Sequence, residues 1–388
     1  MKILMIVFNQ VGRGTYYRAS ALGQELATHN HEITLLATAP KERLRFTETM
    51  LGNIRLVESP DLTRGSLRSG WDPWNVFRRS TWAGRNTFDL VHAFETRPTV
   101  IYPALKIHRR GVPIFMDWAD WFGKGGSVEE RKNPVVRTIL RPVETYYEEH
   151  FRGVAQGTTV ISRSIYQRAI NLGVPENQLL ILPNGANVKA FYPMNQLQAR
   201  DAFGISENTP IIGYMGSIFM QDAQFMADSF NRVRQRIPTA KLMIAGYCPF
   251  DFTKLVSNPE SVIVTGSSTL DKLNNALNCC DILWLPLRNS QANRGRLPLK
   301  ASDYLAVGKP IISTDVGDIR EFLENGDFGA VVPDTVDLFA GAAIDLLADP
   351  YQRKVFGEKA RQYAVDHLRW SHLAQKLEEF YEHSLSSK

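Results

Sequence analysis

The sequence is poor in cysteine: only Cys248, Cys279 and Cys280 occur in 388 residues. Two of them are neighbours, and none has the CxxC spacing of a metal or redox site. So few thiols exclude a small domain held together by disulfides. They favour a reduced, cytoplasmic protein in which the cysteines pack in the core.

Long hydrophobic runs are also absent. No apolar stretch approaches the ~20 residues that a membrane-spanning helix requires. The N-terminal run MKILMIVFN carries one lysine and no small-residue cleavage site, and it stops at Gly12 and Gly14. A buried first strand explains this run better than a signal peptide does. We therefore expect a soluble protein, which still allows a peripheral contact with a membrane.

No strong excess of one charge exists, since the net charge is +5. It is unevenly placed, however: the residues up to Tyr192 hold 25 Lys/Arg and 17 Asp/Glu, and the rest hold 20 and 23. We expect the two halves to meet different partners. The basic bias is modest and no nucleic-acid-binding module is recognisable, so no nucleic-acid partner is expected.

What the sequence does contain is an alternation of short apolar runs and helical stretches, interrupted once near residue 190. The length suits two domains, and such alternation is typical of doubly wound parallel sheets of the α/β class. The expected strands are Lys2–Phe8, Glu32–Ala37, Ile54–Glu58, Leu90–Phe94, Ile114–Trp118, Thr158–Ile161 and Leu179–Leu182, then Ile211–Tyr214, Leu242–Ala245, Ser261–Thr265, Ile282–Pro286, Pro310–Ser313 and Ala330–Val332.

Two of the expected helices have special features. The helical run Pro134–Gly153 contains Pro142, which predicts a kink or a split. The run Trp370–Ser387 predicts an amphipathic helix. Its periodicity does not tell which domain it packs on. The apolar stripe of this last helix consists of Leu373, Leu377, Phe380 and Tyr381.

Two segments have the chemistry of a phosphate site. Gly12-Arg13-Gly14-Thr15 follows the first strand, where glycines let backbone N–H groups approach an anion; a tight turn without a ligand explains it equally well. Asn293–Lys300 holds three cations beyond the end of a strand, where open α/β sheets bind ligands. Arginine and lysine suit phosphate oxygens, although a solvated basic loop is the alternative. The cations are Arg294, Arg296 and Lys300.

Asp303 follows Lys300 by three residues, so the two side chains lie one helical turn apart. A carboxylate there can accept hydrogen bonds from a ribose diol. The alternative is a simple ion pair along the helix.

The run from Arg296 to Pro310 resembles the donor-site motif of family 4 glycosyltransferases, which have the GT-B fold. Further segments resemble this family in the right order along nearly the whole chain: Leu182–Asn187, Tyr214–Ser217, Asp281–Pro286, Asp315–Asp318 and Trp370-Ser371. The resemblance implies two Rossmann-like domains facing a cleft. Residues 1–192 would bind the acceptor, 193–369 would bind the nucleotide sugar, and the helix in 370–388 would return to the first domain.

The resemblance also implies the reaction. It is the retaining transfer of a hexose from a nucleotide diphosphate sugar to a hydroxyl of a glycan or lipid-linked acceptor, as in polysaccharide biosynthesis, without metal or other cofactor. Carried over by position, the diphosphate would meet Arg294, Arg296 and Lys300, with Gly12, Gly14, Thr15, Gly216 and Ser217. The ribose would meet Asp303, and the base would meet the backbone of Ser267, Thr269 and Leu270.

Three positions depart from the family pattern. Ser217 and Asp222 stand where such enzymes commonly have Arg and Lys, and Gly295 replaces the first acidic residue of a pair that ends at Asp303. The usual diphosphate clamp is therefore incomplete, and we expect the 294–300 loop to replace it.

Catalysis would require fixed cations at the diphosphate, because negative charge grows there as the bond breaks. On the acceptor side, His92, Asp117 and Asp120 are candidates to orient or deprotonate the acceptor. Trp118 and Trp121 are candidates to stack on a sugar. A core histidine is the alternative for His92, and helix capping is the alternative for the two aspartates.

The segment 64–85 mixes aromatic and basic residues, among them Trp71, Trp74 and Trp82. This pattern suits the inner face of a membrane or an anionic lipid-linked acceptor; a core helix with a solvated basic face explains it too. Two other functions stay open, a nucleotide-sugar epimerase or hydrolase and a catalytically weak binding protein. The sequence names neither the sugar nor the oligomeric state.

Overall fold

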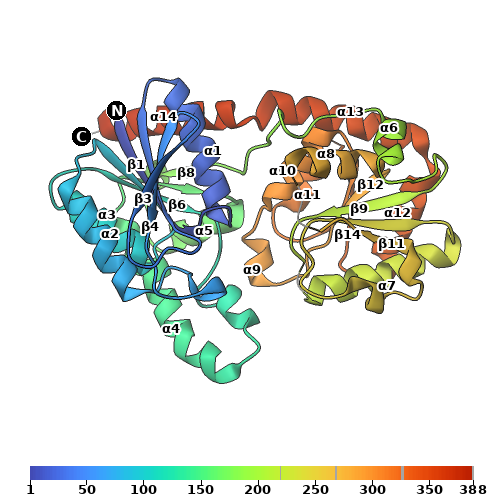
Figure 1. Cartoon of the computed structure of the whole chain (residues 1–388), viewed down its shortest axis with the longest axis horizontal. Helices are drawn as coiled ribbons and strands as arrows, with labels where there is room; N and C mark the ends of the chain where they lie inside the picture. Colours follow the sequence, from blue (N-terminus) through green and yellow to red (C-terminus); the bar gives the residue numbers. More distant parts are fainter. Residues whose placement is uncertain (219, 267–268, 325–326, 387–388) are drawn as a thin grey trace. The chain divides into compact units, whose positions relative to one another are not determined.

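The computed structural model of the chain describes residues 1–218, 220–266, 269–324 and 327–386 (Figure 1). It divides into two compact units, which we call the first unit (Met1–Pro183 with Trp370–Lys388) and the second unit (Asn184–Arg369). The division follows Pro183, somewhat before the predicted boundary after Tyr192.

The first unit is built on a sheet with the strand order β3-β4-β2-β1-β5-β6-β7-β8. Its neighbouring strands run parallel, except that β3 and β4 are antiparallel. Its strands are β1 (Lys2–Gln10), β2 (Glu32–Thr38), β3 (Thr47–Leu51), β4 (Ile54–Ser59), β5 (Leu90–Phe94), β6 (Ile114–Trp118), β7 (Gly157–Val160) and β8 (Leu179–Ile181), and its helices are α1 (Thr15–Thr28), α2 (Pro73–Arg85), α3 (Pro98–His108), α4 (Pro134–His150), α5 (Arg163–Asn171) and α14 (Trp370–Ser386).

The predicted strands of this unit all occur, because their near-continuous apolar runs suit a sheet covered on both faces. The strand β3 was not predicted. It is largely exposed, and a turn at Gly52, where φ is +57°, joins it to β4. A half-solvated edge strand has no apolar run, so only the Gly52-Asn53 turn signals it.

The terminal helix α14 packs in the first unit. The predicted stripe is the buried one: Leu373, Leu377 and Tyr381 are all buried. The Tyr381 ring lies 4.7 Å from the ring of Phe115 on β6. Periodicity therefore predicted the buried face, whereas the choice of unit depends on contacts with distant strands.

The sequence predicts a kink or a split at Pro142; the helix α4 runs without a break from Pro134 to His150, so the split does not occur. Proline lacks the N–H that would bond to the carbonyl of Thr138. Thr138 is exposed, so water can take the place of that donor. The missing hydrogen bond therefore costs too little to divide the helix.

The second unit is built on a parallel sheet with the order β11-β10-β9-β12-β13-β14. Every predicted strand of this half occurs, with ends shifted by a residue or so. Its strands are β9 (Ile211–Met215), β10 (Lys241–Ala245), β11 (Val262–Val264), β12 (Ile282–Leu285), β13 (Ile311–Thr314) and β14 (Gly329–Val332), and its helices are α6 (Gln196–Asp201), α7 (Met220–Arg236), α8 (Leu270–Cys279), α9 (Gln291–Arg294), α10 (Leu299–Val307), α11 (Ile319–Glu324), α12 (Val336–Ala348) and α13 (Pro350–His367).

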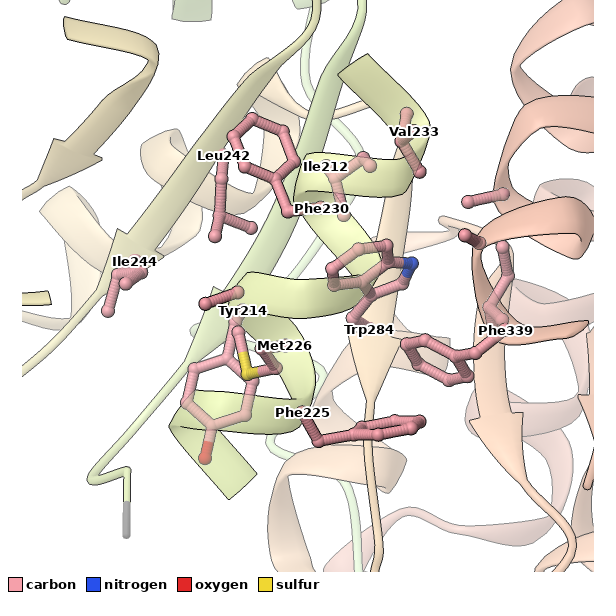
Figure 2. Close-up of a cluster of buried hydrophobic side chains, with 14 of the residues drawn as sticks. Ile212, Tyr214, Phe225, Met226, Phe230, Val233, Leu242, Ile244, Trp284 and Phe339 are labelled. Carbon is pink, nitrogen blue, oxygen red and sulfur yellow. The ribbon is translucent and has the colours of Figure 1, made fainter. Parts of the chain in front are cut away.

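An aromatic cluster forms the core between this sheet and two of its helices (Figure 2). The ring of Phe339 on α12 lies 5.0 Å from Trp284 on β12 and 5.1 Å from Phe225 on α7. Tyr214 at the end of β9 also packs here, and Figure 2 shows its hydroxyl turned away from the cluster. The core thus fixes the carboxyl end of β9. Of the helices in the described ranges, none is both long and apolar enough to cross a membrane.

Candidate functional site

The second unit has a topological switch point between β9 and β12. The chain goes from β9 to β10 on one side, whereas β12 lies on the other side of β9. Open α/β sheets bind ligands beyond the carboxyl ends of such a strand pair, because the two following loops diverge there. The loop after β9 begins at Gly216, and the segment after β12 leads to the three predicted cations.

Lys300 is held over the end of β9. Its Nζ donates a 2.7 Å hydrogen bond to Tyr214 Oη and lies 4.0 Å from the centre of that ring. A Cβ at Gly216 would lie 3.4 Å from the same Nζ. Burial lowers the pKa of Lys300 to about 8, against the opposing effect of the Asp222 carboxylate. The side chain is therefore a fixed cation whose charge depends on a pH close to neutral.

Position 216 favours glycine because its φ is +100°, which a residue with a side chain rarely adopts. Its N–H donates to Ala245 O at 2.8 Å, and Ser217 O accepts a 2.9 Å hydrogen bond from Tyr214 Oη. The predicted contacts of these two residues with a diphosphate would thus have to use groups other than the Gly216 N–H.

The arginines of the 294–300 loop are positioned by asparagine side chains. Arg294 Nε donates to Asn289 Oδ1 at 2.9 Å, and Arg296 donates to Asn293 Oδ1 at 2.8 Å. Asn293 Nδ2 donates to Arg288 O at 2.8 Å, which closes the loop on itself. These hydrogen bonds restrain both arginine side chains, and such restraint reduces the entropy lost on binding.

Asp303 lies on α10 one turn after Lys300, as predicted, and is buried. Its Oδ1 accepts a 3.1 Å hydrogen bond from the backbone N–H of Asn187. Burial raises its pKa to about 7, which that hydrogen bond partly offsets. Its Oδ2 is the oxygen that can accept a hydrogen bond from a ribose hydroxyl without sharing the Asn187 N–H.

The segment after Pro183 is fastened to the same helix. Asn184 Nδ2 donates to Leu297 O at 2.9 Å, and Ser302 Oγ donates to Asn184 O at 2.8 Å. Together with the Asp303–Asn187 hydrogen bond, these contacts hold the start of the second unit against α10. They explain why the second unit begins at Asn184.

The residues predicted to meet the base are only partly described. Thr269 caps α8 and accepts a 3.5 Å hydrogen bond from Lys272 N–H, and Leu270 is half exposed. Ser267 lies outside the described residues.

In the first unit, Gly12, Gly14 and Thr15 form the turn between β1 and α1. Asn9 Oδ1 accepts hydrogen bonds from both the N–H, at 3.2 Å, and the hydroxyl of Thr15. A Cβ at Gly14, where φ is +55°, would lie 2.4 Å from Asn9 Nδ2. These contacts use the two donors of Thr15, and the positive φ of both glycines, +79° at Gly12 and +55° at Gly14, suits a tight turn.

Two of the three predicted acceptor-side residues are structural. Asp117 is 0% exposed, pairs with Arg18 at 2.9 Å and accepts from Thr159 Oγ1 at 2.7 Å. His92 is also 0% exposed and shares a 2.6 Å hydrogen bond with Tyr381. Burial lowers the pKa of His92 to about 4, so it is neutral. Neither side chain is accessible to an acceptor hydroxyl, which corrects the prediction for both.

Asp120 remains accessible, since it is only partly buried beyond the end of β6. The indole N–H of Trp118 donates to the Asp120 carbonyl at 2.9 Å, and the Asp120 backbone N–H donates to Glu95 Oε1 at 3.2 Å. Trp118 is fully buried, so it cannot stack on a sugar as predicted. The ring of Trp121 is already covered by the Arg168 guanidinium, 4.1 Å from its centre.

Glu95 is a residue that the sequence analysis missed. It follows β5, next to the switch point between β1 and β5, with a φ of +67° that non-glycine residues rarely adopt. Its Oε1 also accepts from Ala119 N–H at 2.8 Å, and Arg152 lies 3.6 Å from Oε2. Burial raises its pKa to about 8. An acidic residue directly after a buried strand was the available signal.

No group of three His, Cys, Asp or Glu residues that could hold a metal occurs in the part of the chain that the structure describes.

Comparison with known proteins relates both units to sugar transfer. The family model described as Glycosyltransferase Family 4 matches residues 14–190, and the one described as Glycosyl transferases group 1 matches residues 209–349. The chain belongs to glycosyltransferase family 4.

Two relatives illustrate the range of this family. The glycosyltransferase is 26% identical over 259 residues to the GDP-mannose-dependent alpha-(1-6)-phosphatidylinositol monomannoside mannosyltransferase of Mycolicibacterium smegmatis, covering 63% of this chain and 65% of the relative. It is 26% identical over 400 residues to the N-acetyl-alpha-D-glucosaminyl L-malate synthase of Bacillus anthracis, covering 98% and 96%.

Solved structures show the GT-B fold, with two Rossmann-like units. Sucrose-phosphate synthase from Thermosynechococcus elongatus matches with a TM-score of 0.80 at 16% identity, covering 100% of both chains. WaaG, a glycosyltransferase involved in lipopolysaccharide biosynthesis, matches with a TM-score of 0.75 at 15% identity, covering 97% of this chain and 98% of that chain.

The departures from the family pattern change the charge around Lys300. Asp222 on α7 places a carboxylate close enough to influence the pKa of Lys300 and of Tyr214. Gly295 is buried as the C-cap of α9, with its N–H bonded to Gln291 O at 3.2 Å. In this glycosyltransferase Lys300 contacts the end of β9 directly, through its hydrogen bond to Tyr214.

Proposed function

We propose that this glycosyltransferase takes a hexose from a nucleoside diphosphate sugar bound beyond β9 and β12 and transfers it, with retention, to an acceptor hydroxyl. The observation that carries the proposal is Lys300, a cation fixed at 2.7 Å from Tyr214 at the topological switch point. As the glycosidic bond breaks, negative charge grows on the diphosphate. A preorganised cation there stabilises the transition state more than the bound substrate.

Arg294 and Arg296 would add charge from the loop that follows β12, and Asp303 Oδ2 would accept from the ribose. No step of this scheme uses a metal, because lysine and arginine supply the countercharge of the leaving group. Among neighbours of the same fold, Anabaena HepE was solved in complex with UDP-glucose, and the mannosyltransferase relative is named as GDP-mannose-dependent. These names support a nucleoside diphosphate donor in general.

Asp120 is the carboxylate that we assign to the acceptor. It is partly exposed beyond the carboxyl end of β6. Its backbone N–H donates to Glu95 Oε1, which fixes the position of the residue. A carboxylate placed there can orient an acceptor hydroxyl and take up its proton. Glu95 acts as a positioning residue in this proposal.

The acceptor class is a glycan or a lipid-linked sugar. Names of relatives include phosphatidyl-myo-inositol mannosyltransferase and lipopolysaccharide 1,2-N-acetylglucosaminetransferase, which supports this class. We place the reaction in the cytoplasm. The support is that all three cysteines are free thiols, two of them buried.

The donor half of the proposal is tested by titration calorimetry with UDP and GDP, and by release of the diphosphate from UDP-glucose and GDP-mannose. We expect Lys300→Ala to weaken binding of the preferred diphosphate about 10- to 100-fold, as loss of a charged hydrogen bond does. Arg296→Ala should weaken it less, because Arg296 lies in the loop. Lys354→Ala is the control, since this side chain is 76% exposed and, among the described residues, its one ion pair is with Glu358. Unchanged affinity in both site variants would refute the donor site.

The acceptor half is tested by comparing Asp120→Asn with Asp117→Asn. Asp120→Asn should keep diphosphate affinity and thermal stability but lose transfer by about 100-fold, the contribution of a general base. Asp117→Asn should mainly lower stability, because the buried Arg18–Asp117 ion pair is lost. Diphosphate release that does not depend on any acceptor would instead indicate a hydrolase.

A further inference from the structure

The helix α4 is amphipathic in the opposite sense to an ordinary surface helix. Glu144 and Glu148 lie on the face that packs on the first unit and are only 2% and 3% exposed. Val135 and Ile139 lie on the opposite face and are 65% and 61% exposed. A surface helix normally buries its apolar stripe. Here the apolar stripe faces away from the unit's own core.

Hydrogen bonds fix the helix in this orientation. Glu148 accepts from the N–H groups of Phe122 and Gly123, both at 2.8 Å, and from the Trp118 indole at 3.1 Å. Arg168 pairs with the same carboxylate at 2.9 Å. These are strong interactions of a buried charge, so the helix cannot simply rotate its apolar face inward.

The exposed stripe continues along the helix, and Figure 1 shows α4 reaching away from the sheet of its unit. Tyr146 is 49% exposed and stacks on His150, with ring centres 4.6 Å apart. A tyrosine at the margin of an apolar stripe suits a boundary between apolar and aqueous surroundings. The full stripe consists of Val135, Val136, Ile139, Val143 and Tyr146.

Basic residues border this stripe, and two of them are in ion pairs: Arg131 pairs with Glu144, and Arg141 pairs with Glu129 at 2.8 Å. Residues 131–143 contain four basic residues and no acidic one. Of these, Lys132 and Arg137 form no ion pair with any residue that the structure describes. Beside the helix, Lys124, Arg141 and Tyr146 line a shallow open groove of about 630 Å³ together with Pro142 and Thr145. A groove with two cations and a tyrosine suits a phosphate-containing headgroup.

We propose that α4 lies in the surface of an anionic lipid bilayer, with its apolar stripe at the level of the acyl chains and the cations of 124–141 at the headgroups. An exposed aliphatic stripe flanked by lysine and arginine has the features of an interfacial helix, and anionic lipid complements its charge. The proposal does not depend on the donor or acceptor chemistry, because it concerns binding alone.

This surface differs from the segment 64–85 that the sequence analysis singled out. Arg79 is fully buried and donates to Val7 O at 2.8 Å, and the Trp74 indole donates to Arg43 O at 3.1 Å. The Arg78 guanidinium lies 5.1 Å from the centre of the Trp74 ring. These contacts favour the packing interpretation of 64–85, and α4 takes its place as the membrane surface.

The test is co-sedimentation of the full chain with vesicles of phosphatidylcholine alone and of phosphatidylcholine with phosphatidylglycerol. We expect binding only to the anionic vesicles, weakened by high salt. Ile139→Glu should reduce it at least about tenfold, since one buried aliphatic side chain is lost and a charge is added. Lys132→Ala combined with Arg137→Ala should reduce binding and its salt dependence.

The matched control is Leu338→Glu, the same kind of change at a 51% exposed leucine on α12 of the second unit. It should leave vesicle binding unchanged, as should Leu67→Glu in the segment 64–85. Equal binding of the original chain and of Ile139→Glu would overturn the proposal. So would a dimer in solution that Ile139→Glu converts to a monomer while vesicle binding is absent, because α4 would then join two copies of the chain.

Discussion

The residue that best joins structure to chemistry is Lys300. Its ammonium group is partly buried against Tyr214, and burial brings its pKa to about 8. A cation at a phosphate site is useful only while it is protonated. The position of this side chain therefore sets the pH range in which the donor site is complete.

We predict that affinity for UDP or GDP falls by about tenfold between pH 7 and pH 9. The sign follows from linkage. The free enzyme loses the Lys300 proton near pH 8, whereas the enzyme with bound diphosphate keeps it. Above that pH binding requires the uptake of a proton, so the affinity falls as the pH rises. Titration calorimetry over this range measures the effect. Lys300→Ala should bind more weakly at pH 7 and show little further loss. An equally steep pH dependence in that variant would contradict the assignment.

Asp303 gives a second pH-dependent prediction, on stability. Its pKa of about 7 in the folded state exceeds its ordinary value of 3.8, so between these pH values the folded state holds a proton that the unfolded state has lost. The stability contribution is therefore present at pH 4 and is lost as the pH rises towards 7. Asp303→Asn keeps an acceptor for the Asn187 N–H but has no charge to bury.

We expect Asp303→Asn to match the original chain at pH 4 and to exceed its free energy of unfolding by about 1–3 kcal/mol at pH 8. Urea denaturation at the two pH values measures this. Asp345→Asn, at an exposed position on α12, should show no such difference. A variant that is less stable than the original chain at pH 8 would show that the carboxylate is needed in its charged form.

At the scale of elements, the donor site depends on how the loops after β12 and β13 pack on one another. Gly317, in the loop after β13, has a φ of +61°, and a Cβ there would lie 2.4 Å from Arg294 O. Any other residue at position 317 would therefore force the backbone of α9 to move. The loops that follow the adjacent strands β12 and β13 therefore pack together beside the switch point.

We predict that Gly317→Ala lowers the free energy of unfolding by about 1–3 kcal/mol, through backbone strain and the clash with α9. It should also weaken diphosphate binding, because Arg294 and Arg296 move with α9. Gly341→Ala is the matched control: this helical glycine on α12 has open space around its missing Cβ, so alanine should stabilise by about 0.5–1 kcal/mol. Thermal unfolding and calorimetry distinguish the two. Unchanged diphosphate binding in Gly317→Ala would show that α9 does not contribute to the donor site.

At the scale of the whole molecule, the chain contains two units with separate cores. The first is closed by α14, whose Tyr381 is buried against β5 and β6, and the second by the cluster around Phe339. Separate cores allow the two units to unfold independently. The chain nevertheless passes through both units, since α13 and α14 follow one another in sequence.

We predict that Tyr381→Ala and Phe339→Ala each cost about 3–5 kcal/mol, but in different units. Tyr381→Ala also leaves His92 Nδ1 without its hydrogen bond. Hydrogen exchange followed by peptide analysis should show lost protection mainly in the first unit for Tyr381→Ala and mainly in the second for Phe339→Ala. Equal loss in both units for either variant would indicate one cooperative unit.

Much of the fold was predictable because its signals are local. The buried parallel strands are continuous apolar runs, and the 294–300 segment begins at the end of α9, the short helix that follows β12. The roles of Asp117 and His92 were not predictable, because their partners are remote: Arg18 is 99 residues from Asp117, and Tyr381 is 289 residues from His92. A sequence pattern shows that a residue is polar, but not whether a distant partner has already satisfied it.

The sequence by itself determined the two α/β units, the family and the positions of Lys300 and Asp303 one turn apart, since each depends on neighbours in the chain. Only the tertiary structure decided that Asp117 is an internal ion pair, that Glu95 holds the Asp120 loop, and that α4 turns its apolar face outward. The physical reason is the same in each case. Burial and hydrogen bonding to distant segments fix which face of an element is free and which charge is already paired.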